Sequence, residues 1–144
     1  MKTAQAWLLD LGPFRVAVTY HDVLEVVAEP VIWPLPIGPR WCREILTWRG
    51  RYLPLARLGS GESPFAVVLA VACPKHDDRL EYVAMRLKRT PQLIEVRESD
   101  DCDLPEQMML PADHVLASFR HNEETVLVPD FAALFKIKMV EEAA

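Results

Sequence analysis

The residues best suited to chemistry lie in the segment 40–58, around the run Trp48-Arg49-Gly50-Arg51. Five arginines stand in this segment against a single acid, and large aromatic side chains alternate with them. Arginine and tryptophan are enriched among the energetic hot spots of protein interfaces, and aromatic rings beside cations can also stack the bases of a single-stranded nucleic acid. A plain surface hairpin with half-buried rings and solvated arginines is the third alternative. The segment therefore indicates binding chemistry and leaves the kind of partner open.

Motifs for catalysis, phosphate binding and metal binding are incomplete in this sequence. Cys73 and His76 have C-x-x-H spacing, but a structural zinc site needs four ligands and the other cysteines stand far away. The Gly-Ser-Gly run at 59–61 precedes an expected strand, whereas a phosphate-binding loop leads into a helix. The acids of segment 100–103 lack the glycine and the terminal glutamate of a calcium loop. We therefore expect no catalytic residue, no metal and no cofactor, and predict that the chain is not an enzyme.

The composition is typical of one soluble globular domain, which we expect to span residues 1–144. Hydrophobic residues make up 51% of the chain and charged residues 26%, and the formal net charge is −5. This charge argues against a general nucleic-acid binder, whose affinity depends on neutralising phosphates, and it fits a protein partner better. The three cysteines are an odd number without a C-x-x-C pair, so we expect no disulfide framework.

The apolar runs are too short for a signal peptide or a membrane-spanning helix. The longest of them, Phe65–Cys73, is far shorter than the roughly 20 residues that a transmembrane helix requires. Asp10 interrupts the apolar stretch near the N-terminus before it reaches the length of a signal sequence. We therefore expect a cytoplasmic protein without direct membrane insertion.

Turn residues divide the chain into short strands that must position the basic stretch. Gly12-Pro13 lies between two segments of alternating apolar and polar residues, which predicts an antiparallel hairpin. Gly50 can adopt a positive φ, so Arg49-Gly50 is expected at the tip of a second hairpin. Pro54 has no amide donor, which places the second arm of that hairpin at a sheet edge or ends its pairing there.

Short strands separated by turn signals predict an all-β barrel or sandwich with little helix. The four prolines of segment 30–39 exclude a regular helix and a central strand, so an extended apolar connection is expected there. Segment 22–29 is predicted as a short helix, and Asp130 is expected to cap a helix near the C-terminus. The acidic segment 98–103 is expected to be a solvated loop. Outside the Arg49-Gly50 hairpin, strands are predicted at 5–11, 14–20, 65–73, 80–87, 92–96, 107–110, 115–119 and 125–128.

Several of these motifs resemble the CheW-like family, the adaptor domains of bacterial chemosensory systems. The run Ile45-Leu-Thr-Trp-Arg-Gly-Arg-Tyr-Leu-Pro-Leu-Ala-Arg-Leu58 is similar to the family's L-R-G-x-x-x-P-x-x-D-L signature. Thr47 and Trp48 replace an asparagine and an aliphatic residue, and Arg57 replaces the acid. The resemblance covers about residues 6–135 and also includes Val23-Leu-Glu-Val26, Leu35-Pro-Ile-Gly38 and Thr125-Val-Leu-Val-Pro-Asp-Phe-Ala-Ala-Leu-Phe135.

The resemblance implies two interlaced five-stranded β-barrels, with a core between them and a C-terminal helix. It implies a non-catalytic adaptor that docks onto the signalling tip of a chemoreceptor and onto the regulatory domain of a histidine kinase, at membrane-attached receptor arrays. The departures favour a divergent adaptor of a system that controls type IV pili and twitching. The rival interpretation is a small β-barrel that binds single-stranded nucleic acid. Arg49 and Gly50 match the family's partner-binding arginine and glycine, and we expect the partner-binding site to contain Trp48, Arg49, Gly50, Tyr52, Ile32 and Trp33.

Overall fold

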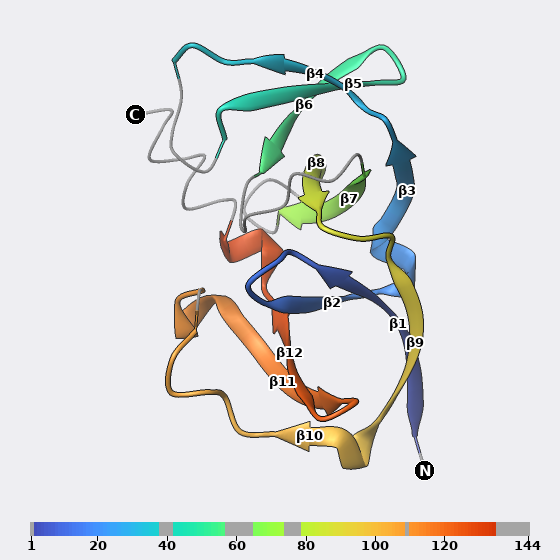
Figure 1. The fold of residues 1–144 in the computed structure, drawn as a ribbon, viewed down its shortest axis with the longest axis vertical. Helices are drawn as coiled ribbons and strands as arrows, with labels where there is room; N and C mark the ends of the chain where they lie inside the picture. The colour runs from blue at the N-terminus through green and yellow to red at the C-terminus, as the bar shows by residue number, and fades with distance from the viewer. Residues whose placement is uncertain (1, 38–41, 57–64, 74–78, 109, 135–144) are drawn as a thin grey trace.

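The computed structural model describes residues 2–37, 42–56, 65–73, 79–108 and 110–134, which form two curled sheets (Figure 1). Sheet A contains, in spatial order, β10 (Asp101–Cys102), β11 (Val115–His121), β12 (Glu124–Pro129), β2 (Arg15–Thr19), β1 (Thr3–Asp10) and β9 (Gln92–Arg97). Sheet B contains β3 (Val23–Ala28), β7 (Phe65–Cys73), β8 (Arg79–Leu87), β6 (Arg51–Ala56), β5 (Glu44–Trp48) and β4 (Val31–Pro34).

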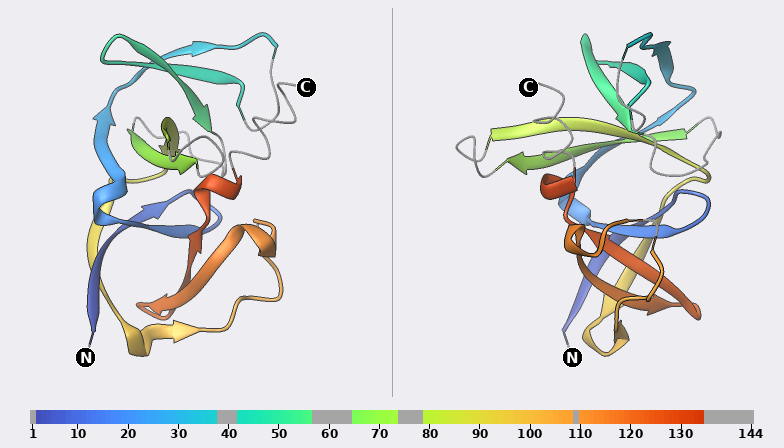
Figure 2. Two further views of the ribbon diagram at one scale, coloured as in Figure 1. Left: turned by 180° about the vertical axis from the view of Figure 1, so that it is seen from behind. Right: turned by 90° about the vertical axis from the view of Figure 1, so that its left-hand side faces the viewer.

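The two sheets are interlaced along the chain. Sheet B forms from the continuous segment 23–87, which is inserted between β2 and β9 of sheet A. Figure 2 shows the two curled sheets stacked end to end. The prediction of an all-β fold with a paired-barrel architecture and a small helix is therefore confirmed. Among the described residues each sheet has six strands, and the sixth is a short edge strand, β4 or β10.

The apolar core has three layers. The central layer lies between the sheets and combines residues of both, among them Leu9 and Val16 from sheet A and Leu69 and Met85 from sheet B. A second layer is confined to sheet B and a third to sheet A. In strand β2, Val16, Ala17 and Val18 are all buried because both faces of the strand are covered. Apolar and polar residues therefore do not alternate strictly in this part of the sequence.

Two predicted elements near the first sheet crossing take another form. Segment 22–29 is not a helix: a 3₁₀ turn, η1 (Tyr20–Asp22), leads into β3, which pairs antiparallel with β7. Val23, Val26 and Val27 favour the extended backbone because their branched side chains pack well on a pleated surface. Segment 31–34 forms β4, an edge strand paired only with β5, which agrees with the exclusion of a central strand there.

Two further predictions in the second half of the chain are wrong. The expected loop 98–103 contains a 3₁₀ turn, η3 (Glu98–Asp100), and then β10, which pairs with β11. The strand predicted at 107–110 is absent from the described residues 107, 108 and 110. A third 3₁₀ turn, η4 (Ala112–His114), instead leads into β11. The acidic residues of segment 98–103 suggest a solvated loop. Instead, the Asp100 carboxylate accepts a hydrogen bond from the Arg97 amide (3.1 Å), and this bond orders the turn.

The helix near the C-terminus begins where the sequence predicts. Asp130 caps it, because its Oδ1 accepts a hydrogen bond from the Ala133 amide (3.1 Å) and its carbonyl accepts one from the Leu134 amide (2.9 Å). Leu134 is buried in the central layer of the core. The helix is described over 131–134, and its predicted residues Phe135 and Met139 lie outside the described residues.

The cysteines whose side chains are described are free thiols. Cys42 is a buried free cysteine and Cys102 a half-buried one, and the side chain of Cys73 lies outside the description. Burial raises the pKa of the Cys42 thiol above its ordinary value, although hydrogen bonds with the backbone of Glu44 and Leu55 partly oppose that rise. None of the described helices is long and apolar enough to span a membrane.

The turn between β11 and β12 yields a prediction about stability. Asn122 and Glu123 both have positive φ, 48° and 66°, as in a type I′ hairpin, and a glutamate is strained in that region. We expect Glu123→Gly to raise the free energy of unfolding by about 0.5–1 kcal/mol, measured by urea denaturation. The control is Glu124→Gly in β12, which should lower stability. A loss of stability of the same size in both variants would show that Glu123 is not strained.

Candidate functional site

The hairpin between β5 and β6 displays an arginine at a strained backbone position. Arg49 has φ +48° and Gly50 has φ +74°, and Trp48 pairs with Arg51 across the turn. Glycine adopts this conformation freely, but an arginine there costs about 1 kcal/mol. A Cβ at position 50 would meet no atom within 4 Å, so the backbone conformation alone favours glycine there. The predicted hairpin tip is confirmed, and a side chain is retained where glycine or asparagine is the usual choice.

Glu25 on β3, an edge strand of sheet B, holds this tip. Its Oε2 accepts a hydrogen bond from Trp48 Nε1 (3.2 Å), and its Oε1 accepts one from Arg49 Nη2 (2.8 Å). The guanidinium of Arg49 also lies over the indole ring of Trp48, 4.9 Å from its centroid. Because sheet B curls, its first strand meets the hairpin tip, as Figure 1 shows. One carboxylate therefore fixes both the buried ring and the exposed cation.

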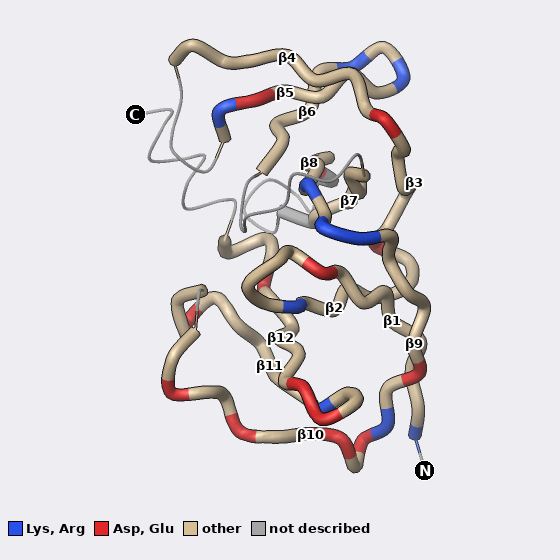
Figure 3. The backbone as a smooth tube through the Cα atoms, viewed as in Figure 1, with Lys and Arg blue, Asp and Glu red and all other residues tan. Residues whose placement is uncertain are grey.

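Tyr82 on β8 completes the arrangement. Its ring lies 6.0 Å from the Trp48 ring at an angle of 54°, and the Arg51 guanidinium lies 5.0 Å from its centroid. We call Glu25, Trp48, Arg49, Arg51 and Tyr82 the tip cluster. It presents two cations against one carboxylate in a protein whose net charge is −5. Figure 3 shows the two basic positions at the end of the hairpin.

A largely apolar surface begins beside the tip cluster. Pleating places alternate residues of β4, β5 and β6 on opposite sides of the sheet, and the register aligns Val31, Thr47 and Tyr52 across the three strands. Trp33 is 52% exposed and donates a hydrogen bond from Nε1 to Thr47 Oγ1 (3.0 Å), and Tyr52 is 71% exposed. The outer face, as we name it, consists of Val31, Trp33, Ile45, Thr47, Tyr52 and Pro54.

Neither of the two effects predicted for Pro54 is found, because the pairing of β6 with β5 continues through Pro54 to Leu55. Strand β6 is not an edge strand, because it lies between β5 and β8. Its parallel pairing with β8 is recorded at Leu55 and Ala56, directly after the proline.

The six predicted site residues fall into three groups. Trp48, Arg49 and Gly50 lie together at the tip, but Trp48 is only 9% exposed and packs in the core layer of sheet B. Trp33 and Tyr52 lie on the outer face. Ile32 points to the opposite side and packs against the core of sheet B. The prediction thus joined two surfaces and two core positions, Trp48 and Ile32.

Sequence reasoning missed Glu25, Arg51 and Tyr82 as members of the site. A signal for Glu25 was present, because it stands two residues before Val27, on the side of β3 that faces the core layer of sheet B. An acid in such a position needs a partner. Nothing in the local sequence indicates that the partners stand on β5 and its turn. In the part of the chain that is described, no three His, Cys, Asp or Glu side chains form a group that could hold a metal ion.

Comparison with known proteins supports the fold. No model of a protein family matches the sequence, and no curated protein matches it. Among solved structures, the chain is similar to the scaffolding protein TtCheW from Thermoanaerobacter tengcongensis, with a TM-score of 0.73 and 15% sequence identity. The similarity covers 94% of this chain and 89% of that chain. The chain therefore has the CheW-like fold that its motifs predict.

Proposed function

We propose that the chain is a non-catalytic adaptor that couples chemoreceptors to a histidine kinase through protein contacts alone. The observation that carries this proposal is the tip cluster, which holds an exposed arginine on a strained turn by a carboxylate from another strand. Backbone strain of this kind persists where a function maintains it. The similarity of the fold to a scaffolding protein supports the same function.

The residues of the site have different roles in this proposal. Arg49 is the polar anchor that meets the partner, and Gly50 allows the turn that displays it. Trp48 acts through Glu25 and Arg49, because its ring is buried beneath the guanidinium. Trp33 and Tyr52 provide exposed apolar area beside the anchor, and Ile32 supports them from inside the sheet. Buried aromatic and arginine contacts of this kind dominate the energy of many protein interfaces.

The proposed partners are the signalling tip of a chemoreceptor and the regulatory domain of the kinase. We place the protein in the cytoplasm at receptor arrays, and we propose type IV pili and twitching as the output of the system. The net charge of −5 supports a protein partner over a nucleic acid, because an acidic protein repels phosphates.

The decisive experiment measures whether the chain bridges its two partners. Isothermal titration should show binding of the full chain to the isolated receptor tip and to the isolated regulatory domain. Sedimentation should then show a ternary complex when all three are mixed. A single-stranded oligonucleotide serves as the competitor and should not bind at low or high salt. Failure to bind either protein would refute the adaptor function, and salt-dependent oligonucleotide binding would favour the rival class.

A further inference from the structure

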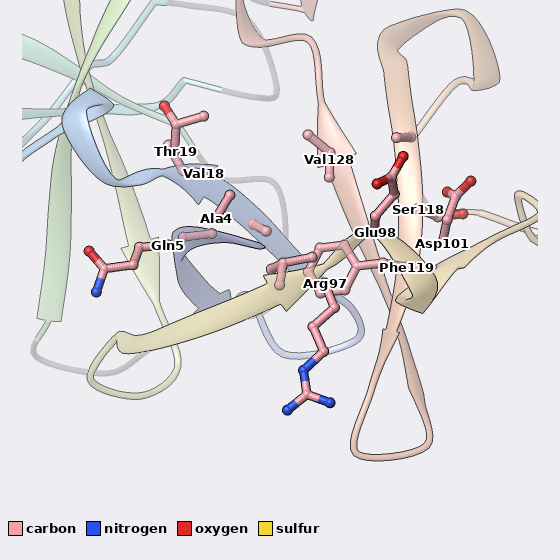
Figure 4. A pocket seen from close by; sticks show the side chains of 14 residues that line it. Ala4, Gln5, Val18, Thr19, Arg97, Glu98, Asp101, Ser118, Phe119 and Val128 are labelled. Atoms are coloured by element: carbon pink, nitrogen blue, oxygen red, sulfur yellow. The ribbon is translucent and has the colours of Figure 1, made fainter. Parts of the chain in front are cut away.

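Sheet A curls around an open cavity that the proposed adaptor contacts do not use. Its volume is about 350 Å³, within the range of small-molecule pockets. All six strands of sheet A and the turn η3 contribute to its wall (Figure 4). Strands β9 and β10 are the two edges of the sheet, and η3 connects them. The cavity therefore lies inside the curl of the sheet, where its two edges come near each other without pairing.

The cavity exists because small side chains stand on the inner side of sheet A and leave space between them. On β1 the residues that face the inside of sheet A are Ala4, Ala6 and Leu8, of which the two alanines line the cavity. Ala17 lines it from β2. Small barrels normally fill their interior with side chains. Leu8 packs in the core layer of sheet A, but the alanines leave the other end of the curl unfilled.

The deep wall of the cavity is apolar and well buried. Ala6, Ala17 and Phe119 are each less than 10% exposed, and Val96 and Val128 pack beside them. An apolar body is therefore the part of a ligand that this wall would bind.

Of the polar side chains that line the cavity, two carboxylates remain available to a ligand. Ser118 Oγ donates to the carbonyl of Cys102 (3.0 Å), and Thr19 Oγ1 donates to Asp22 (2.7 Å), so both hydroxyl protons are engaged within the protein. Figure 4 shows the side chains of Arg97 and Gln5 extending away from the other lining residues.

Glu98 and Asp101 remain, and they come from η3 and β10 at the mouth. Both are exposed, and within the described part of the chain neither takes part in an ion pair. A positive group at the mouth would satisfy them without the cost of displacing an internal partner.

We propose that this cavity binds a small organic cation, with an apolar body against the alanine-lined wall and an ammonium group at Glu98 and Asp101. The proposal does not depend on the adaptor function, because it uses sheet A and the tip cluster belongs to sheet B. An adaptor with this site would bind a small molecule directly, in addition to its protein partners. The charge pattern favours a cation over an anion of the same shape, since the two carboxylates repel a negative group.

The test uses 2-phenylethylammonium as the probe on the full chain. Titration followed by amide NMR shifts should give a dissociation constant of about 1 mM or tighter, which is reasonable for a ligand of this size. The largest shifts should fall at Ala6, Ala17 and Phe119. Two matched probes share its shape: 2-phenylethanol should bind about fivefold more weakly and 3-phenylpropionate more than tenfold more weakly. Absence of binding, or equal binding of all three probes, would overturn the proposal.

Two kinds of variant test separately how the cavity space and the two carboxylates contribute to binding. Ala17→Leu fills the space and should abolish binding of the cation, while the double variant Glu98→Gln with Asp101→Asn should reduce the preference over the alcohol to nearly none. Ala17 is buried, so Ala4→Leu at the more exposed mouth is the second filling variant. Circular dichroism checks that each variant is folded. A folded filling variant that binds the probe as tightly as the wild type would refute the site.

Discussion

Replacing Trp48 with alanine should lower the free energy of unfolding by about 3 kcal/mol or more. The indole is only 9% exposed and packs in the core layer of sheet B beside Tyr82, so its removal leaves a large cavity. The change also removes the donor to Glu25 and the ring beneath Arg49, which loosens the tip cluster. Urea denaturation of the wild type and the variant measures the difference.

Two control variants show where that energy arises. Trp48→Leu keeps an apolar side chain in the core and should cost about 1–2 kcal/mol, because it loses the hydrogen bond and part of the volume. Trp33→Ala removes the same ring from a position that is 52% exposed and should cost less than about 1 kcal/mol. Equal losses for Trp48→Ala and Trp33→Ala would show that Trp48 is not a core residue.

Reversing the charge of Arg49 should weaken partner binding about 30-fold, or by about 2 kcal/mol. The Arg49 side chain is 68% exposed and carries one of the two cations that the tip presents. Arg49→Glu places a second carboxylate beside Glu25 and opposes an acidic partner group. Titration against the receptor tip and the kinase domain measures the loss. Arg120→Glu, on β11 of sheet A, is the matched control and should leave binding unchanged.

A charge swap separates direct contact from support of the turn. Glu25→Arg combined with Arg49→Glu restores an ion pair between the two strands but leaves the displayed charge reversed. Binding should therefore stay weak in the double variant. Recovery to the wild-type affinity would mean that Arg49 acts through the pair with Glu25 and does not touch the partner. Because an exposed pair contributes at most about 1 kcal/mol to stability, both variants should remain folded.

Arg49→Gly should weaken partner binding without lowering the stability of the protein. Glycine relieves the strain of the positive φ, so the free energy of unfolding should change little or rise, while the anchor is lost. This combination is the expected sign of a residue that is kept for recognition at some cost to stability.

Short-range turn chemistry made most of the fold predictable. Gly12-Pro13 and Arg49-Gly50 each join neighbouring antiparallel strands, as their backbone preferences require. The capping carboxylate of Asp130 likewise marks the start of the helix. The helix predicted at 22–29 was wrong because its valines satisfied helical spacing by chance, whereas pairing with β7 decided their conformation.

Long-range contacts explain why the site was only partly predictable. The exposed arginine and its glycine were found because they stand together in one turn. Glu25 stands 24 residues before Arg49, and only the curl of sheet B brings them together. The opposite orientations of Ile32 and Trp33 follow from the register of β4 on β5, which proline-rich sequence obscures.

The insertion of sheet B within sheet A has a consequence for the order of folding. All of sheet B comes from one continuous segment, whereas β1 must wait for β9 and β2 must wait for β12. During synthesis the first hairpin would therefore remain a marginal two-stranded ribbon until the last strands emerge. Such distant pairings give a high contact order, so the chain should fold in milliseconds to seconds, with sheet B assembling first and sheet A closing last.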